Sequence, residues 1–277
     1  MFKNTIDIIS EIGWNHMGNL DLAKKMIIAS KESGATIVKF QVWDPSYLKS
    51  GPWDKDGRKE IYNSASLDDQ DISELINFCN NISIDCLFSV FGTIAASRLI
   101  SLNIKNVKIP SHEITNIKLC ELAKNNFDKI YISTGASKEI ELKKTIDVFK
   151  NSNKYINLMH CVSSYPCDIK TINLPRISWL KQFNYDIGFS DHTSETITPA
   201  LAIISGASVI EKHFTIDNEL PGRDNKFALT PDKFKEMVGH IEKAFFANKY
   251  IGNDFQESEE DIIHNYRGRW EPADYED

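Results

Sequence analysis

The chain has 277 residues, 42% of them hydrophobic and 26% charged, which is enough to bury a large core in one enzyme-sized domain. Its formal net charge of −7 argues against nucleic acid as a partner, although local lysines can still form a positive pocket for an anionic substrate. No apolar run approaches the ~20 residues of a membrane helix and no signal peptide is recognisable, so we expect a cytoplasmic protein without membrane contact.

Short runs rich in Ile, Val and Phe recur along the chain, and amphipathic stretches separate them. The eight candidate strands are IISEIG (8–13), TIVKFQV (36–42), IDCLFSV (84–90), NVKIPS (106–111), KIYIST (129–134), INLMHC (156–161), DIGFSD (186–191) and SVIEKHF (208–214). Continuous apolar character, rather than strict alternation, is typical of parallel strands that helices cover. The pattern predicts an α/β fold of the (β/α)8 TIM-barrel type.

Two of the intervening stretches carry clear helix boundaries. The stretch NLDLAKKMIIASKESG has Asn19 as an N-cap and Gly34 as a stop. The stretch LTPDKFKEMVGHIEKAFF has Thr230 as a cap and Pro231 in the first helical position. These signals predict one helix after the first strand and another after the last.

No Gly/Ser/Pro-rich linker divides the chain, so we assign residues 1–252 to a single barrel domain and residues 253–277 to a C-terminal tail. We expect this tail to wrap the barrel or to meet a partner chain. Residues 44–69 lack clear periodicity. They predict a long loop after the second strand that closes over a site, with a disordered insertion as the alternative.

The five cysteines show no paired framework, and Cys86 and Cys161 lie within candidate strands. This placement predicts reduced, buried thiols rather than a disulfide scaffold. Such thiols agree with a cytoplasmic protein.

Polar residues gather where the candidate strands end. In a barrel of this type the C-terminal strand ends form the active face, so we expect these side chains at one mouth. They are Glu11, Asn15, His16, Lys39, Gln41, Lys108, Ser111, Glu113, Ser133, Thr134, Ser163, Ser164, Tyr165, Ser190, Asp191, His192, Glu211, Lys212 and His213.

Lys39 and Lys108 lie within otherwise apolar strands, where a buried ammonium group requires a counter-charge. Together with hydroxyl groups at the same mouth, they predict a site for a phosphate, or for a phosphate plus a carboxylate. The alternative is that each lysine only pairs with a barrel glutamate, such as Glu11 or Glu211.

His192 and His213 end two successive strands of the predicted barrel, with Asp191 and Glu211 nearby. Imidazole pairs of this kind favour a divalent metal such as Mn, Fe or Zn, and hydrogen-bonded structural histidines are the alternative. The other histidines divide into possible site contacts (His16 and His112), a core residue (His160) and structural residues (His240 and His264).

Seven motifs resemble, in order and spacing, the N-acetylneuraminate (sialic acid) synthase family. They are SEIGWNHMGNLDLAKKMI, GATIVKFQ, KIPSHEI, ISTGAS, HCVSSYP, GFSDHT and EKHFT, of which GFSDHT followed by EKHFT and PGRD is the most specific. The resemblance extends from Ile8 to about Ala247. It implies an enzyme, a transferase that condenses phosphoenolpyruvate with an amino-sugar aldose and releases phosphate, forming a sialic-type 2-keto-3-deoxy acid.

The resemblance also implies roles for individual residues. Glu113 matches a catalytic carboxylate, and Glu11 is the second catalytic candidate. Positions that hold phosphoenolpyruvate are matched by Lys39, Lys108, Ser111, Ser133, Ser163 and Ser190. Positions near the acceptor sugar are matched by Asn15, Gln41, Tyr165, Glu211 and Asp224. His192 and His213 match metal ligands, usually for manganese, with Mg, Co, Zn and Fe as alternatives.

The chain departs from the family pattern in three places. Val90 stands where the family often has a threonine of the phosphoenolpyruvate pocket, and Ser163 stands where it often has Asn. The resemblance covers the barrel but not the small C-terminal antifreeze-like domain, which gives an arginine to the partner's sugar site in a homodimer. Arg267 or Arg269 would then replace that arginine in part.

Two other readings stay open at this point. A related synthase would use a different or a phosphorylated aldose, and a phosphorylated acceptor would require an additional basic pocket. An inactive barrel would serve as a binding module. The presence of Lys39, Glu113, His192 and His213 together argues against the second reading, because a binding module does not require all of them.

Overall fold

The computed structural model describes residues 6–270 of the chain. Contacts within the chain divide it into two compact units, Met1–Ala247 and Asn248–Asp277. The first unit is the barrel, and the second contains η8 (Glu257–Glu259) and α10 (Glu260–Asn265). No helix among the described residues is long and apolar enough to span a membrane.

Eight parallel strands form a closed barrel in the order of the chain, with β1 paired to both β2 and β8. The strands are β1 (Asp7–Gly13), β2 (Ile37–Val42), β3 (Asp85–Val90), β4 (Asn106–Ile109), β5 (Lys129–Ser133), β6 (Tyr155–His160), β7 (Asp186–Asp191) and β8 (Val209–His213). Each overlaps one candidate strand, and the bounds differ by at most two residues. The predicted (β/α)8 TIM-barrel fold is confirmed.

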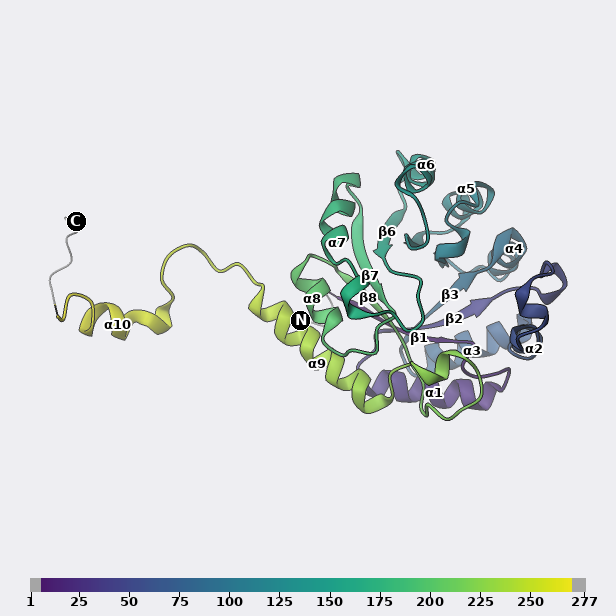
Figure 1. Cartoon of the computed structure of the whole chain (residues 1–277), viewed down its shortest axis with the longest axis horizontal. Helices are drawn as coiled ribbons and strands as arrows, with labels where there is room; N and C mark the ends of the chain where they lie inside the picture. Colours follow the sequence, from purple (N-terminus) through teal and green to yellow (C-terminus); the bar gives the residue numbers. More distant parts are fainter. Residues whose placement is uncertain (1–5, 271–277) are drawn as a thin grey trace. The chain divides into compact units, whose positions relative to one another are not determined.

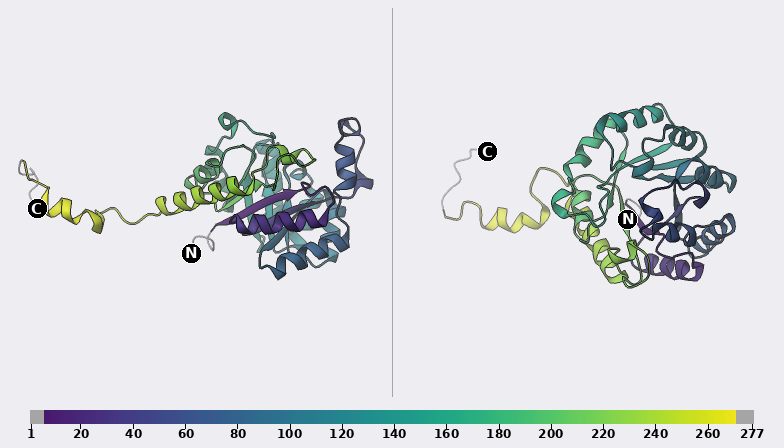
Figure 2. Two further views of the ribbon diagram at one scale, coloured as in Figure 1. Left: turned by 90° about the horizontal axis from the view of Figure 1, so that it is seen from below. Right: turned by 45° about the vertical axis from the view of Figure 1, so that its right-hand side comes forward.

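Helices surround the strands and cover their outer face (Figures 1 and 2). They are α1 (Leu20–Glu32), α2 (Arg58–Ser64), α3 (Asp69–Asn81), α4 (Gly92–Ser101), α5 (Ile117–Asn126), α6 (Glu139–Phe149), α7 (Pro175–Leu180), α8 (Thr198–Ile204) and α9 (Pro231–Ala247). The shorter 3-10 helices of the barrel unit are η2 (Pro45–Tyr47), η3 (Pro52–Asp54), η4 (Ser111–Glu113), η5 (Ile169–Thr171), η6 (Lys181–Phe183) and η7 (Asp224–Lys226).

The helix boundaries read from the sequence at Asn19, Gly34 and Pro231 are confirmed. The side chain of Asn19 accepts a hydrogen bond of 2.9 Å from the backbone N–H of Leu22, as an N-cap should. Gly34 follows the helix with a φ of +100°, a left-handed conformation that glycine adopts without strain. Pro231 begins α9. All five cysteines are free, as expected.

The long connection after β2 is present, but it is not irregular. Residues 44–69 contain η2, η3 and the helix α2, and Asp69 begins α3. Gly57 has a φ of +83° and caps α2, so the Asp-Gly sequence at this point is a turn that starts a helix. The lack of apolar periodicity reflects a helix that buries little and projects beside the mouth of the barrel (Figure 1).

Successive side chains of each strand point to opposite sides of the barrel wall, so the buried apolar residues form two separate clusters. Side chains that face the helices form the main apolar core, as Phe40 and Phe88 do. Side chains that face the barrel axis form a small apolar plug: Ile9, Ile37, Leu87, Tyr131, Met159 and Val209. The polar strand-end residues lie on the same inward face, two positions further along each strand, as Glu11 follows Ile9. The plug therefore closes the barrel below the polar residues.

Lys212 is an exception, because it faces outward and is buried in the apolar layer, with 2% exposure. Its ammonium group lies 2.6 Å from Asp191 on the neighbouring strand and donates to the carbonyl oxygens of Thr193 and Glu195. Asp191 also accepts a hydrogen bond of 2.5 Å from Thr198. This cluster ties β7 and β8 together behind the barrel.

We expect Lys212→Met to lower the free energy of unfolding by about 3 kcal/mol, because it leaves the Asp191 carboxylate buried without a cation. Urea denaturation measures the loss. Lys144→Met on the exposed surface of α6 is the control and should change stability little. A Lys212→Met protein as stable as the Lys144→Met control would show that the buried pair is dispensable.

Candidate active site

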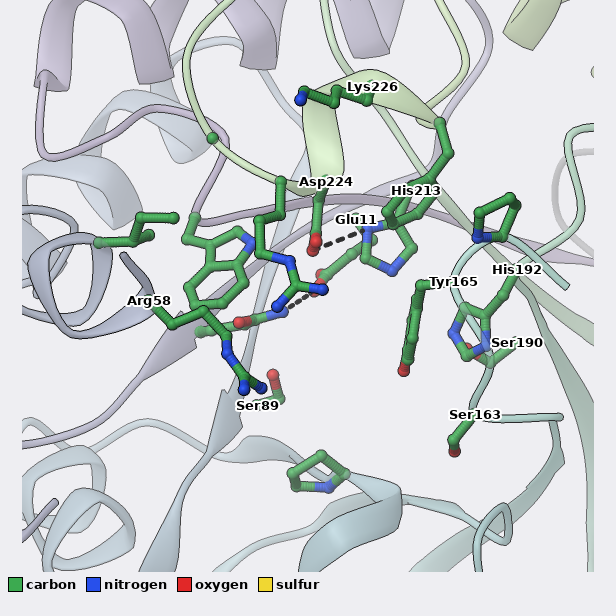
Figure 3. Close-up of a pocket in the computed structure, with 18 of the residues that line it drawn as sticks. Glu11, Arg58, Ser89, Ser163, Tyr165, Ser190, His192, His213, Asp224 and Lys226 are labelled. Atoms are coloured by element: carbon green, nitrogen blue, oxygen red, sulfur yellow. Dashed lines mark hydrogen bonds and ion pairs between the residues drawn. The ribbon is translucent and has the colours of Figure 1, made fainter. Parts of the chain in front are cut away.

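A cavity of about 1050 Å³ opens at the C-terminal mouth of the barrel. Its floor comes from strand ends, and its rim comes from α2 and from the segment between β8 and α9. Figure 3 shows side chains from these elements converging on one space. Most of the site residues predicted from the sequence line this cavity. They are Glu11, Lys39, Gln41, Lys108, Ser111, His112, Ser133, Ser163, Tyr165, Ser190, His192, Glu211, His213 and Asp224.

The floor holds a network of buried charges. Lys39 Nζ lies 2.6 Å from Glu11 Oε2 and 3.7 Å from Glu211 Oε2. Lys108 Nζ lies 2.5 Å from Glu211 Oε1. All four side chains are at most 4% exposed. The lysine–glutamate pairing considered as an alternative from the sequence is therefore present.

Hydrogen bonds complete this network. Gln41 donates to Glu11 Oε1 at 2.5 Å, and Ser190 donates to Glu211 Oε1 at 2.8 Å. Burial raises the pKa of Glu11, although Lys39 opposes this effect. Burial alone would also raise the pKa of Glu211, but Lys108 and Lys39 outweigh it and lower that pKa to about 2. Glu211 is thus the fixed anion of the floor, and Glu11 is the carboxylate more easily protonated.

His192 and His213 lie on one side of the cavity, with ring centroids 5.6 Å apart. His192 Nδ1 lies 2.7 Å from the carbonyl oxygen of Val162, so Nδ1 carries the proton and Nε2 keeps its lone pair. His213 Nδ1 is buried without a hydrogen bond, 3.5 Å from Asp224 Oδ2 (Figure 3). Burial lowers the pKa of His192 to about 4, and burial together with the neighbouring His192 lowers the pKa of His213 well below its ordinary value. Both imidazoles are therefore neutral near pH 7.

A small cradle of hydroxyl groups also borders the cavity. Ser111 Oγ lies 3.0 Å from Cys161 Sγ, and Ser163 Oγ is buried without a hydrogen bond partner. Gly135 closes the cradle. A Cβ atom there would lie 2.6 Å from both Cys161 Sγ and Ser163 Oγ, and 2.9 Å from Ser111 Oγ. The absence of a side chain at this position keeps the hydroxyl groups accessible.

Two residues with expected roles do not line the cavity. Asn15 is fully buried and donates a hydrogen bond of 2.8 Å to the carbonyl oxygen of Phe214, which ties the segments that follow β1 and β8. Glu113 lies in η4, where its carboxylate accepts a hydrogen bond of 2.8 Å from Asn116. Val90, noted as a departure from the family pattern, belongs to the outer core and not to the cavity.

The remaining expected contacts are placed as follows. Tyr165 packs its ring on His192, with centroids 4.3 Å apart. His112 packs edge-on against Phe91, 4.6 Å between centroids, at the cavity wall. His16 is fully buried and accepts a hydrogen bond from the N–H of Gly18, outside the cavity. His160 is a core residue, as expected, and lies 2.6 Å from the carbonyl oxygen of Ile172.

The sequence did not single out several lining residues, most of which lie in connections, although Ser89 belongs to β3. These are chiefly Trp14, Arg58, Tyr62, Ser89, Phe91, Arg223, Lys226 and Phe227. Arg58 belongs to α2, and the basic residues Arg223 and Lys226 follow β8. The PGRD motif marked the position of Arg223 but gave it no role.

The fold and the cavity together define a (β/α)8 barrel whose polar residues meet at the C-terminal mouth, the usual place of the active site in such barrels. The model of the NeuB family matches residues 26–252. The chain belongs to the NeuB family.

Its relatives include named synthases of sialic-type acids. The N,N'-diacetyllegionaminic acid synthase of Legionella pneumophila is 36% identical over 257 residues, which cover 87% of this chain and 72% of the relative. The pseudaminic acid synthase of Campylobacter jejuni is 33% identical over 271 residues, covering 93% and 78% of the two chains. Both relatives are acid synthases by name, and the names differ in the acid.

A solved structure agrees with this family. The N-acetylneuraminic acid synthetase of Leptospira borgpetersenii, in complex with citrate, has a TM-score of 0.85 and 29% identity. The match covers 94% of this chain and 91% of that one. The similarity extends over the whole barrel.

We expect Glu211→Gln to destabilise the protein by about 3 kcal/mol at pH 7, because Lys108 loses its anion in a dry site. The pKa of Glu211 is about 2 in the folded protein, below its ordinary value of 4.5. Its contribution is therefore complete above pH 4.5 and is lost as the pH falls toward 2. Denaturation of both proteins at neutral and acid pH measures the difference, which should shrink in acid. A stability difference between the two proteins that stays constant from neutral to acid pH would contradict the role of Glu211 as the buried anion.

Proposed function

We propose that this chain is a phosphoenolpyruvate-dependent synthase that condenses phosphoenolpyruvate with an amino-sugar aldose. The product is a sialic-type 2-keto-3-deoxy acid, and phosphate is released. One observation carries the proposal: a NeuB-family barrel brings two lysines, a cradle of serines and two neutral imidazoles to one cavity. A new carbon–carbon bond joins C3 of phosphoenolpyruvate to the aldehyde carbon, and water adds at C2 before phosphate leaves.

The hydroxyl cradle and the lysines supply the donors that phosphoenolpyruvate requires. Each oxygen of its phosphate and carboxylate accepts hydrogen bonds. Ser111 and Ser163 offer hydroxyl groups around Gly135, and Ser133 lines the same cavity. Lys39 and Lys108 supply charge-assisted contacts from the floor. These groups come from different strand ends, so they orient the substrate as well as bind it.

Charge balance within the floor argues for an additional cation. Lys39 and Lys108 are already paired with Glu11 and Glu211, so the four groups together are close to neutral. A trianionic substrate is then bound only if another positive charge accompanies it or if Glu11 takes up a proton. The raised pKa of Glu11, caused by its burial, makes the second route available.

His192 and His213 fit a divalent cation, for which manganese is our proposal. Metal-binding imidazoles must be neutral, and burial keeps both in that form. The buried Nδ1 of His213 has no hydrogen bond partner, as an atom reserved for a ligand would have none. Among residues 6–270 no third His, Cys, Asp or Glu completes a cluster, so the donor set is open to water and substrate. Such a cation, when bound, supplies polarisation of the acceptor's aldehyde oxygen.

Glu11 is the carboxylate best placed to move a proton in the reaction. It lines the cavity, and its pKa is raised by burial, which suits a group that carries a proton near neutral pH. Glu113 must turn away from Asn116 before it reaches the cavity. Asp224 is the third candidate, because burial and the charge of Glu11 raise its pKa to about 7.

The proposal is tested by phosphate release from phosphoenolpyruvate in the presence of a panel of amino-sugar aldoses. Release that depends on both substrates, together with a 2-keto-3-deoxy acid of matching mass, supports it. No release with any aldose and any divalent cation would refute it and favour a binding module. The Glu11→Gln variant should lose turnover at least about a hundredfold.

We expect Gly135→Ala to weaken phosphoenolpyruvate binding about tenfold or more, because the new methyl group displaces the hydroxyl groups of Ser111 and Ser163. Isothermal titration calorimetry measures the change. Gly239→Ala in α9 is the matched control, since a Cβ there meets nothing within 4 Å. Equal affinities in both variants would place phosphoenolpyruvate elsewhere in the cavity.

We expect the purified protein to bind one divalent cation per chain at His192 and His213. His213→Ala should abolish binding, measured by metal analysis after dialysis, while the far-UV circular dichroism of the barrel stays unchanged. His240→Ala, on the distant helix α9, is the control and should keep the metal. Full turnover in protein freed of metal by a chelator would refute the metal site.

A further inference from the structure

A partly buried arginine beside the hydroxyl cradle has no role in the proposed reaction so far. Arg176 belongs to α7 and is not one of the residues that line the cavity. Its Nη1 donates a hydrogen bond of 2.9 Å to Thr134 Oγ1, and its Nη2 donates one of 2.9 Å to the carbonyl oxygen of Thr134. The planar guanidinium group thus binds one residue at two atoms, which is a geometry that lysine cannot reproduce.

Thr134 connects two parts of the cavity wall. Ser133 before it and Ala136 after it both line the cavity, and Gly135 closes the hydroxyl cradle. Ala136 has a φ of +48°, a left-handed conformation that alanine keeps only where its surroundings hold it. The N–H and the hydroxyl group of Thr134 both donate to the carbonyl oxygen of Met159. The turn after β5 is therefore held between β6 on one side and Arg176 on the other.

The position of Arg176 is itself set by neighbouring side chains. His160 Nε2 lies 2.6 Å from the carbonyl oxygen of Ile172, so Nε2 carries the proton and Nδ1 can accept a hydrogen bond. Arg176 Nη1 lies 3.4 Å from this Nδ1. Burial lowers the pKa of His160, so the ring is neutral and keeps the acceptor. The ring of Trp179 also lies near the guanidinium group, with 5.8 Å from Cζ to the ring centroid.

The charge of Arg176 is not cancelled by a carboxylate. Among residues 6–270, no Asp or Glu forms an ion pair with it. The lysines of the floor differ in this respect, because Lys39 and Lys108 each have a glutamate partner. An unpaired positive charge that touches Thr134 makes the electrostatic potential at the neighbouring turn more positive, which favours an anion there.

A purely structural tie is the alternative role. Arg176 would then only fasten α7 to the end of β5. Lys124 of α5 is an example of such a tie, because its Nζ donates a hydrogen bond of 2.7 Å to the carbonyl oxygen of Val148 in α6. Neither residue of this second pair lines the cavity. The two ties are similar in chemistry and differ in whether they hold a part of the site.

We propose that Arg176 is a positioning residue for phosphoenolpyruvate. It holds Thr134 so that Ser133 and Ala136 face the cavity and the cradle around Gly135 stays open. This inference rests on the proposed condensation reaction. It gives α7 a part in substrate binding, although none of the lining residues comes from that helix.

Calorimetric titration with phosphoenolpyruvate, without an acceptor, tests this role. We expect Arg176→Gln to raise the Kd about tenfold or more, because the charge and the contact at two atoms are both lost. Arg176→Lys should retain part of the affinity, since it keeps the charge alone. Lys124→Gln also removes a hydrogen bond from a cation to a backbone carbonyl, so it is the matched control and should bind phosphoenolpyruvate as the wild type does.

Kinetics separate positioning from a structural tie. In Arg176→Gln, KM for phosphoenolpyruvate should rise about tenfold, while KM for the acceptor aldose should stay within about twofold of the wild-type value. An unchanged Kd for phosphoenolpyruvate in Arg176→Gln overturns the inference, and so does an equal loss of affinity in Lys124→Gln. If Arg176→Gln does not fold, Thr134→Val decides, because it removes one of the two acceptors. Wild-type affinity in that variant also overturns the inference.

The same titration distinguishes this inference from the proposed reaction. If no aldose supports phosphate release but Arg176→Gln still weakens phosphoenolpyruvate binding, the reaction fails and the role of Arg176 stands. If phosphate is released and the variant binds phosphoenolpyruvate normally, the reaction stands and the inference fails. A wild-type protein that binds no phosphoenolpyruvate overturns both.

Discussion

The structure depends on the burial of four charged side chains in the mouth of the barrel. Lys39, Lys108, Glu11 and Glu211 are almost inaccessible to water, and each is tolerated only because the others are present. Their register explains why they meet: Glu11 lies beside Lys39 on β1 and β2, and Glu211 reaches both lysines across the barrel. The network therefore gives the site its shape before any substrate arrives, and it also limits the charge available to an anionic ligand.

The repeated apolar runs were enough to predict the fold, because each buried strand of a barrel is a short continuous run with a helix on either side. Residues at the strand ends were also predictable as neighbours. Once the parallel order is known, side chains such as Ser190 and Glu211 lie in register on adjacent strands. Capping residues such as Asn19 were readable for a local reason, since the hydrogen bond that they make lies within one turn.

The parts of the site that come from connections were not predictable. Arg58 and Arg223 face one cavity because of where α2 and the segment after β8 fold, and no periodicity in the sequence reports this. For Glu113 and Asn15, the sequence predicted the position near the mouth but not the direction of the side chain. Both come shortly after strands, yet hydrogen bonds turn Glu113 toward Asn116 and Asn15 toward the backbone of Phe214. Position in the sequence brings a residue to the mouth, but its partners decide which way its side chain points.

The ion pair between Asp191 and Lys212 has a consequence for the histidines in front of it. Asp191 precedes His192, Lys212 precedes His213, and the two charged residues are partners in the β7–β8 register. A buried ion pair thus joins β7 and β8 immediately behind the two imidazole rings. This ion pair holds the two strands together at the point where the two rings, with centroids 5.6 Å apart, reach the cavity. A cation held by both histidines, as we propose, would have to fit this spacing between the rings.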